Sequence, residues 1–215
     1  TDRGGRELPL AEGVHQWVAM TRATQQRDAH LYIIGNGGSA GMASHMATDA
    51  AKNGRLRALA FNDSSFLTAT GNDLAYDQVF SLPLERLARS GDMLIAISSS
   101  GNSANIVRAL EVARELGVGV VTLTGMRADN KARALGDLNF YVPLSRYGWA
   151  ESAHQGLHED TIRQARLQLA VHRGQHGVRS TVTARGASPA GVPQKGEPAG
   201  QDVRRPGLPH HVGHD

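Results

Sequence analysis

The sequence predicts an α/β fold, a parallel sheet covered by helices on both faces, from two observations. Five short apolar runs, most of them rich in β-branched residues, alternate with segments whose apolar residues have helical spacing. Each run is bounded by Gly, Asn, Asp or Ser, residues that commonly end strands. Strands that alternate with helices pair in parallel, because each helix carries the chain back across the sheet.

The expected elements follow in a regular order, with no internal repeat and no linker, so residues 1–172 are expected to form one domain. Strands are expected over 31–35, 57–61, 92–98, 119–125 and 138–144. Helices are expected over 10–25, 38–53, 64–72, 76–89, 102–116, 128–135 and 150–171; the last of these is called the closing helix below.

Residues 173–215 differ in composition from the rest of the chain. They hold five of the eight prolines and eight of the 25 glycines, without an aromatic residue or an apolar period. Such a segment cannot bury enough surface to offset its ordering entropy, so we expect a disordered tail.

The charge distribution argues against a nucleic-acid partner. The tail carries the whole net charge of +3, whereas the remaining residues contain 17 basic and 17 acidic side chains. No apolar stretch approaches the roughly 20 residues that span a membrane. No leader is visible, although the chain starts at Thr1 without a methionine, and the lack of cysteine leaves the compartment undecided. The default expectation is a cytoplasmic protein, and neither a nucleic-acid nor a membrane partner is expected.

Two loops at the expected carboxyl ends of strands have an unusual composition. The glycine loop, residues 35–41 (GNGGSAG), lets the backbone approach a ligand closely. The serine loop, residues 98–103 (SSSGNS), places four hydroxyl groups before a helix. A helix cap accounts for one of these serines but not for four. Hydroxyl and N–H groups at two helix N-termini indicate a phosphate site.

The glycine loop also fits the G-x-G-x-x-[GA] pattern of dinucleotide-binding proteins, and Asp63 stands where such proteins bind a ribose. A dinucleotide site needs only one such loop. A second loop of hydroxyl groups suits a compact, multiply charged phosphate that is held from several sides. The sequence therefore favours a phosphorylated small molecule, and no nucleotide cofactor is expected.

The segments GNGGSA…SH and ISSSGNS.N, with GND at 71–73 and VTLTG at 121–125, resemble the SIS (sugar isomerase) domain family, and within it the phosphoheptose isomerases. The resemblance implies a three-layer αβα fold around a five-stranded parallel sheet, and a homotetramer with shared active sites. It also implies conversion of sedoheptulose 7-phosphate to D-glycero-D-manno-heptose 7-phosphate through an enediol. That reaction would supply activated heptoses for polysaccharide or for a secondary metabolite.

The resemblance and the two loops together give a set of expected substrate-binding residues. The serines would bind the phosphate, the glycine loop would line the sugar pocket, and GND would hold hydroxyl groups. The residues are Asn36, Gly37, Gly38, Ser39, Asn72, Asp73, Ser98, Ser99, Ser100, Ser103 and Glu151.

Ketose–aldose isomerisation requires a base, an acid and a group that stabilises an oxyanion. His45 and Asp49 are four residues apart, hence on one helix face. Glu151, His154 and His158 share a face of the closing helix. Any one of these residues alone is explained better as part of a solvated helix face. The two clusters together support a functional role about equally well.

In phosphoheptose isomerases the first cluster has the form H-x-x-x-E and the second Q-E-x-H-x-x-x-x-H, and many members bind zinc through them. By this resemblance His45 matches the first His and Asp49 replaces the Glu. Glu151 replaces the Gln, His154 matches the next His, and His158 is the nearest match to the last, one residue early. The expected catalytic residues are Asp49, His158 and His154, and a possible Zn²⁺ site consists of His45, Asp49, Glu151 and His158.

A non-catalytic SIS module is the alternative function. The family includes a protein that binds the bacterial replication initiator and domains that sense phosphosugars. Asp49 is one methylene shorter than the Glu of the motif, and such a displacement can cost about 100-fold in rate. The closing helix also departs from the motif, because His158 comes one residue early. Both differences favour the alternative, in which the chain binds a phosphosugar or a protein without turnover.

Overall fold

The computed structural model describes residues 1–144, 148–150, 152–157, 159, 161 and 163–164 of the 215-residue chain. All of them belong to one unit, Thr1–Val178. The expected tail lies outside the described residues, so the domain boundary at residue 172 stays a prediction. Among the described helices, none combines the length and the apolarity needed to cross a bilayer.

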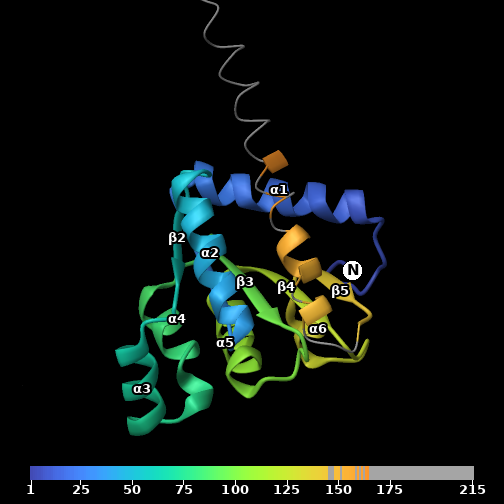
Figure 1. Cartoon of the computed structure of the whole chain (residues 1–215). Helices are drawn as coiled ribbons and strands as arrows, with labels where there is room; N and C mark the ends of the chain where they lie inside the picture. Colours follow the sequence, from blue (N-terminus) through green and yellow to red (C-terminus); the bar gives the residue numbers. More distant parts are fainter. Residues whose placement is uncertain (145–147, 151, 158, 160, 162, 165–215) are drawn as a thin grey trace, which may run out of the picture. The chain divides into compact units, whose positions relative to one another are not determined.

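A five-stranded parallel sheet forms the middle layer (Figure 1). Its strands are β1 (His30–Gly35), β2 (Arg57–Ala60), β3 (Met93–Ser98), β4 (Gly119–Gly125) and β5 (Leu138–Val142). They lie in the order β2-β1-β3-β4-β5, and every neighbouring pair is parallel. The predicted fold class is therefore confirmed. The three inner strands are apolar almost throughout because both of their faces are buried.

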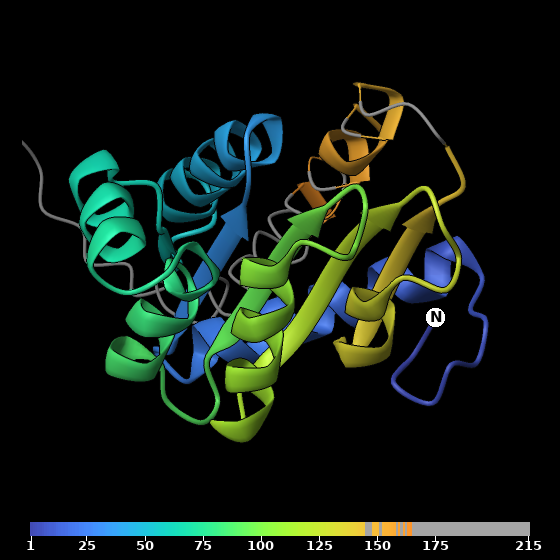
Figure 2. The ribbon, with the colours of Figure 1, turned by 90° about the horizontal axis from the view of Figure 1, so that it is seen from below.

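Helices cover the two faces of this sheet (Figure 2). Helices α1 (Leu10–Gln26) and α2 (Gly38–Lys52) pack on one face, and α4 (Ser81–Leu87), α5 (Ala104–Glu115) and α6 (Lys131–Leu135) pack on the other. Alternate side chains of each strand enter the two cores. In β1, Leu31 and Ile33 face α1 and α2, whereas Tyr32 and Ile34 face α4 and α5.

The segment between β2 and β3 differs from the prediction. Helix α3 (Ser64–Asp73) is present, but the single helix expected over 76–89 is wrong. A 3₁₀ turn, η1 (Tyr76–Gln78), precedes α4, which begins only at Ser81. Pro83 explains the break, because proline has no N–H to donate and fits the first turn of a helix but not its interior.

The strand order creates a crevice at the carboxyl edge of the sheet. After β1 the chain enters α2 on one face, whereas after β3 it enters α5 on the other face. Gly35 pairs with Ile97, so the glycine loop and the serine loop leave adjacent strand ends in opposite directions. Open α/β sheets bind their ligands at such a switch point.

The described residues from 148 onward are helical, in agreement with the expected closing helix. Leu157 of this helix packs against the core that α1 and α2 share with the sheet. The closing helix therefore lies on the same face of the sheet as α2.

Candidate active site

The glycine loop turns directly from β1 into α2. A Cβ atom at Gly35 would lie 2.6 Å from the carbonyl oxygen of Ser39, so a larger residue cannot occupy this position. Gly37 is the N-cap residue of α2 and has φ +56°, in the left-handed region that favours glycine. The first N–H groups of α2 therefore lie at the crevice, where they and the helix dipole favour an anion.

The serine loop is a turn braced by its own hydroxyl groups. Ser98 Oγ accepts a hydrogen bond from the Gly101 amide at 3.1 Å, and Ser100 Oγ accepts one from the Asn102 amide at 3.3 Å. Gly101 has φ +63°, and a Cβ there would collide with the side chain of Asn130. The turn conformation is thus fixed by its own hydrogen bonds and by Asn130, in the loop that precedes α6.

The other two serines of the loop do not brace the turn. Ser99 is buried, and its Oγ has no hydrogen-bond partner among the described residues. Ser103 is the N-cap residue of α5, yet its side chain makes no capping hydrogen bond. A hydroxyl that only accepts, as in Ser98 and Ser100, still has a proton to donate. Each of these hydroxyl groups therefore still has a proton to donate, although that of Ser99 is buried.

A pair of side-chain amides joins the two loops. Asn36 Nδ2 donates to Asn105 Oδ1 at 2.9 Å, and Asn105 Nδ2 donates to Asn36 Oδ1 at 2.9 Å. Asn105 lies in the first turn of α5 and is buried. The Tyr76 hydroxyl group is 3.3 Å from the same Asn36 oxygen.

The GND segment ends α3. Asn72 and Asp73 are exposed, and Asn72 Nδ2 donates to Asp73 Oδ1 at 2.8 Å. None of the described hydrogen bonds of these two side chains reaches either loop. Three residues on, Tyr76 does contact Asn36, so the segment returns to the crevice. Asp63, considered above as a ribose ligand, caps α3 by accepting the Phe66 amide at 2.8 Å.

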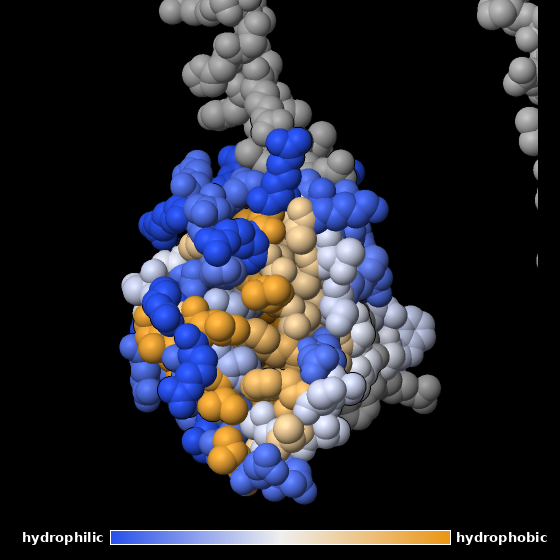
Figure 3. Space-filling view, turned by 90° about the vertical axis from the view of Figure 1, so that its left-hand side faces the viewer, coloured by the Kyte–Doolittle hydropathy of each residue, from blue (hydrophilic) through white to orange (hydrophobic). Residues whose placement is uncertain are grey.

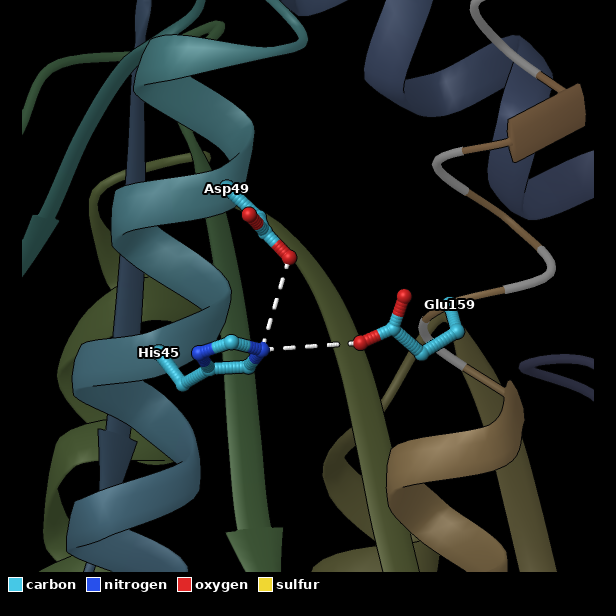
Figure 4. A group of neighbouring side chains, drawn as sticks. All are labelled: His45, Asp49 and Glu159. Carbon is cyan, nitrogen blue, oxygen red and sulfur yellow. Dashed lines mark ion pairs between the residues drawn. The ribbon is translucent and has the colours of Figure 1, made fainter.

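A cluster of one histidine and two carboxylates lies beside α2 (Figure 4). His45 Nε2 is 3.5 Å from Asp49 Oδ2 and 3.5 Å from Glu159 Oε1. His45 and Glu159 are exposed, whereas the Asp49 side chain keeps only 21% of its surface in solvent. Asn53 orients Asp49 by donating to its other oxygen at 3.0 Å.

The cluster contains a residue that sequence analysis did not select. Glu151 and His158, two of the four predicted metal ligands, lie outside the residues whose side chains are described. Glu159 occupies their expected place beside His45 and Asp49. It stands five residues after His154, which is the spacing of the last histidine in Q-E-x-H-x-x-x-x-H. Counting strictly from His154 would have identified position 159, where this chain has a carboxylate.

The cluster fits a divalent metal ion. The candidate ligand atoms of His45, Asp49 and Glu159 all lie within 4.8 Å of one another. A tetrahedral ion with bonds of 2.0–2.2 Å separates its ligand atoms by about 3.3–3.6 Å, close to the two distances measured from His45. One imidazole nitrogen and two carboxylate oxygens suit Zn²⁺ and related ions, with a position left for water or substrate.

His154, the third predicted catalytic residue, is fully buried. Its Nε2 lies 3.0 Å from the carbonyl oxygen of Thr124, at the end of β4. A carbonyl can only accept, so in the neutral ring Nε2 carries the proton. Burial lowers the pKa of this imidazole below its ordinary value, which favours the neutral form.

These features define the class of protein. A model of the SIS domain family matches residues 9–125, which is more than half of the chain, and the chain belongs to the SIS domain family. The resemblance deduced from the two loops is thereby confirmed.

Several relatives similar in sequence to this chain are phosphoheptose isomerases. Phosphoheptose isomerase of Aliarcobacter butzleri is 42% identical over 140 residues, 62% of this chain and 73% of that protein. Phosphoheptose isomerase of Akkermansia muciniphila is 38% identical over 140 residues, 62% of this chain and 74% of that protein. The structure of phosphoheptose isomerase from Neisseria gonorrhoeae matches with a TM-score of 0.68 at 35% identity, covering 73% of this chain and 86% of that one.

Proposed function

We propose that this chain is a phosphosugar isomerase that converts sedoheptulose 7-phosphate to D-glycero-D-manno-heptose 7-phosphate. One observation carries the proposal: two loops suited to an anion leave adjacent strands at the switch point, and α2, which begins at one of them, carries His45 and Asp49. The similarity to phosphoheptose isomerases supports the choice of a heptose. The product would enter the synthesis of activated heptoses for polysaccharide or for a secondary metabolite.

The phosphate group binds at the serine loop in this proposal. The four serine hydroxyl groups can donate to its oxygens, and the N-terminus of α5 adds N–H groups and a favourable dipole. The glycine loop, with Asn36, Gly37, Gly38 and Ser39, lines the sugar pocket. Asn72, Asp73 and Glu151 are proposed to hold sugar hydroxyl groups.

Two carboxylates are then available for proton transfer. In aldose formation a base removes a proton from C1 of the ketose while O2 gains one, and the enediol loses a proton from O1 and gains one at C2. Asp49 and Glu159 flank His45 and suit these proton transfers, because a carboxylate can accept a proton as a base and then donate it as an acid. Asp49 can act as the base or as a metal ligand, and the two roles remain alternatives.

A divalent ion such as Zn²⁺, held by His45, Asp49 and Glu159, would stabilise negative charge that develops on the sugar oxygens. The side chains provide the ion's ligands, and Asn53 keeps Asp49 in place for either role.

We also propose that the protein is a cytoplasmic homotetramer with shared active sites. Apolar side chains gather on the face formed by β2, α2 and α3 (Figure 3). Leu59 of the edge strand β2 is 45% exposed, and Phe66 and Leu74 are exposed at α3. Such a patch beside an unpaired strand edge is typical of an interface between protein chains.

The direct test is to incubate the purified full-length protein with sedoheptulose 7-phosphate, with and without Zn²⁺, and to follow the aldose by NMR. We expect aldose to form. A folded protein that shows no turnover in either condition would refute the isomerase. Tight phosphosugar binding by calorimetry without turnover, or co-purification with a partner, would favour the non-catalytic SIS module.

A further inference from the structure

We infer that Asn105 is a positioning residue, which sets the distance between the glycine loop and the serine loop through Asn36. Asn105 lies two residues after the serine loop, on the first turn of α5, and is only 2% exposed. This inference rests on the proposed binding of a phosphosugar between the two loops.

The geometry shows a complete exchange of hydrogen bonds between Asn36 and Asn105. Each amide nitrogen donates to the other oxygen at 2.9 Å, although the residues are 69 positions apart. Each side chain satisfies one donor and one acceptor of the other. Only a carboxamide can both donate and accept in this way.

The amide pair lies beyond the last backbone pairing between β1 and β3. Strand pairing between β1 and β3 ends at Gly35 and Ile97. Beyond these residues the chain enters α2 on one face and α5 on the other. Among the described residues, the two amide bonds are the only hydrogen bonds between residues 36–41 and 98–105.

Burial makes this pair effective as a spacer. Water cannot easily replace either bond at Asn105, and an unpaired buried amide is costly. Two helix N-termini can act on one phosphosugar only when they are held at the right separation. A change in this separation would leave one of the two loops unable to contact the phosphosugar well, so binding would weaken.

The substitution that tests this role is Asn105→Leu, which keeps the volume of the side chain and removes both hydrogen bonds. We expect the dissociation constant for sedoheptulose 7-phosphate and KM to rise by about tenfold or more, as the loss of a buried hydrogen bond allows. We expect kcat to change much less, because the carboxylates of the acid–histidine cluster, His45, Asp49 and Glu159, are untouched. Asn105→Ser serves as a second variant if the leucine variant does not fold.

Asn139 provides a matched control. It is also a buried asparagine, 3% exposed, and accepts a hydrogen bond from Thr122 Oγ1 at 2.5 Å, but it lies on β5. Asn139→Leu should lower the thermal midpoint without changing KM. In an Asn36→Leu background, Asn105→Leu should have little further effect, since Asn105 acts through Asn36.

A measurement without substrate separates this inference from the proposed function. Amide hydrogen exchange of residues 37–40 should become faster in Asn105→Leu and stay unchanged in Asn139→Leu. If wild-type protein does not bind the phosphosugar, the proposed function is refuted, and the exchange result still decides whether Asn105 holds the loops. Unchanged exchange and unchanged KM in Asn105→Leu, or equal effects in both variants, would overturn the inference.

Discussion

At the scale of single residues, the acid–histidine cluster depends on how Asp49 and Glu159 approach His45. Asp49 belongs to the same helix as His45, one turn further on, and its second oxygen is held by Asn53. Glu159 comes from the closing helix and reaches the same imidazole nitrogen (Figure 4). The shorter side chain of Asp49 is thus accompanied by a carboxylate where the family motif has its last histidine.

The first prediction concerns Asp49. Asp49→Asn keeps the shape of the side chain and removes its charge, so we expect turnover to fall by about 10² to 10⁴. Phosphosugar binding, measured by calorimetry, should be almost unchanged because the serine loop is a separate element. Asp49→Glu restores the residue of the family motif and should keep or raise activity. Asp28→Asn, at an exposed turn before β1, is the control. Normal turnover in Asp49→Asn would mean that Asp49 has no catalytic role.

The second prediction distinguishes Glu159 from His158. Glu159→Gln removes one charged ligand from the cluster, so Zn²⁺ affinity, measured by titration, should fall by about 10-fold or more, together with turnover. Glu159→His restores the last histidine of the family motif and should retain metal binding. His158→Gln is the matched control on the neighbouring position. A loss of Zn²⁺ binding in His158→Gln but not in Glu159→Gln would support the assignment made from sequence.

At the scale of elements, the closing helix contacts the end of β4, next to the serine loop. His154 contacts the carbonyl of Thr124, and the following amide, Gly125, donates to the Ser99 carbonyl at 3.0 Å. A Cβ at Gly125 would lie 3.3 Å from the Ala150 Cβ and 3.3 Å from the Ser99 oxygen. The helix, the strand end and the loop therefore pack together with little room to spare.

The third prediction is a pH dependence of stability that depends on His154. The unfolded histidine titrates near pH 6.5, whereas burial lowers the pKa of His154 in the folded protein. Below pH 6.5 the unfolded chain binds more protons, so the free energy of unfolding is highest above this pH and falls as the pH drops toward the folded pKa.

The measurement is denaturant unfolding of wild type and variants between pH 5 and pH 8, a range that includes the titration of histidine. His154→Gln retains an N–H donor for Thr124 but does not titrate, so this part of the acid destabilisation should be absent. Ser152→Ala, at an exposed position of the same helix, should behave like wild type. An identical pH profile in His154→Gln would show that protonation of His154 does not limit stability.

At the scale of the whole molecule, β2 is an edge strand of the sheet that the described residues form. Its residues alternate between exposed and half-buried, and Leu59 is 45% exposed. Apolar side chains gather on this side of the molecule (Figure 3). An unpaired edge strand with apolar side chains is a site of association unless charges protect it. The apolar character of this face is therefore the structural reason to expect an oligomer.

The fourth prediction is that association requires this face. Light scattering should give a mass about four times the 22.9 kDa of one chain for the wild type. Leu59→Asp places a charge in the proposed interface and should shift the protein to smaller species. Leu87→Asp, which changes another exposed leucine at the end of α4, is the comparison. A tetramer that survives Leu59→Asp would place the interface elsewhere.

The local pattern of the chain was sufficient for most of the fold. Short apolar runs bounded by Gly, Asn, Asp or Ser identified all five strands, and the glycine and serine loops stood out by composition. The helix expected over 76–89 failed because the apolar spacing continued across Pro83, whose missing N–H stops the helix from starting before Ser81. Glu159 was not predicted because the family motif has a histidine at this place, although the motif spacing from His154 leads to position 159.

The sequence by itself determined most of the elements and the two unusual loops that follow β1 and β3, because these features depend on residues close together along the chain. Only the tertiary structure decided which distant side chains meet. Asn36 pairs with Asn105, and His45 approaches Glu159, because the strand order brings β1 beside β3 and the closing helix packs on the face of α2. Sheet order and helix packing follow from burying both faces of the sheet at once, a condition on the whole chain that no local pattern contains.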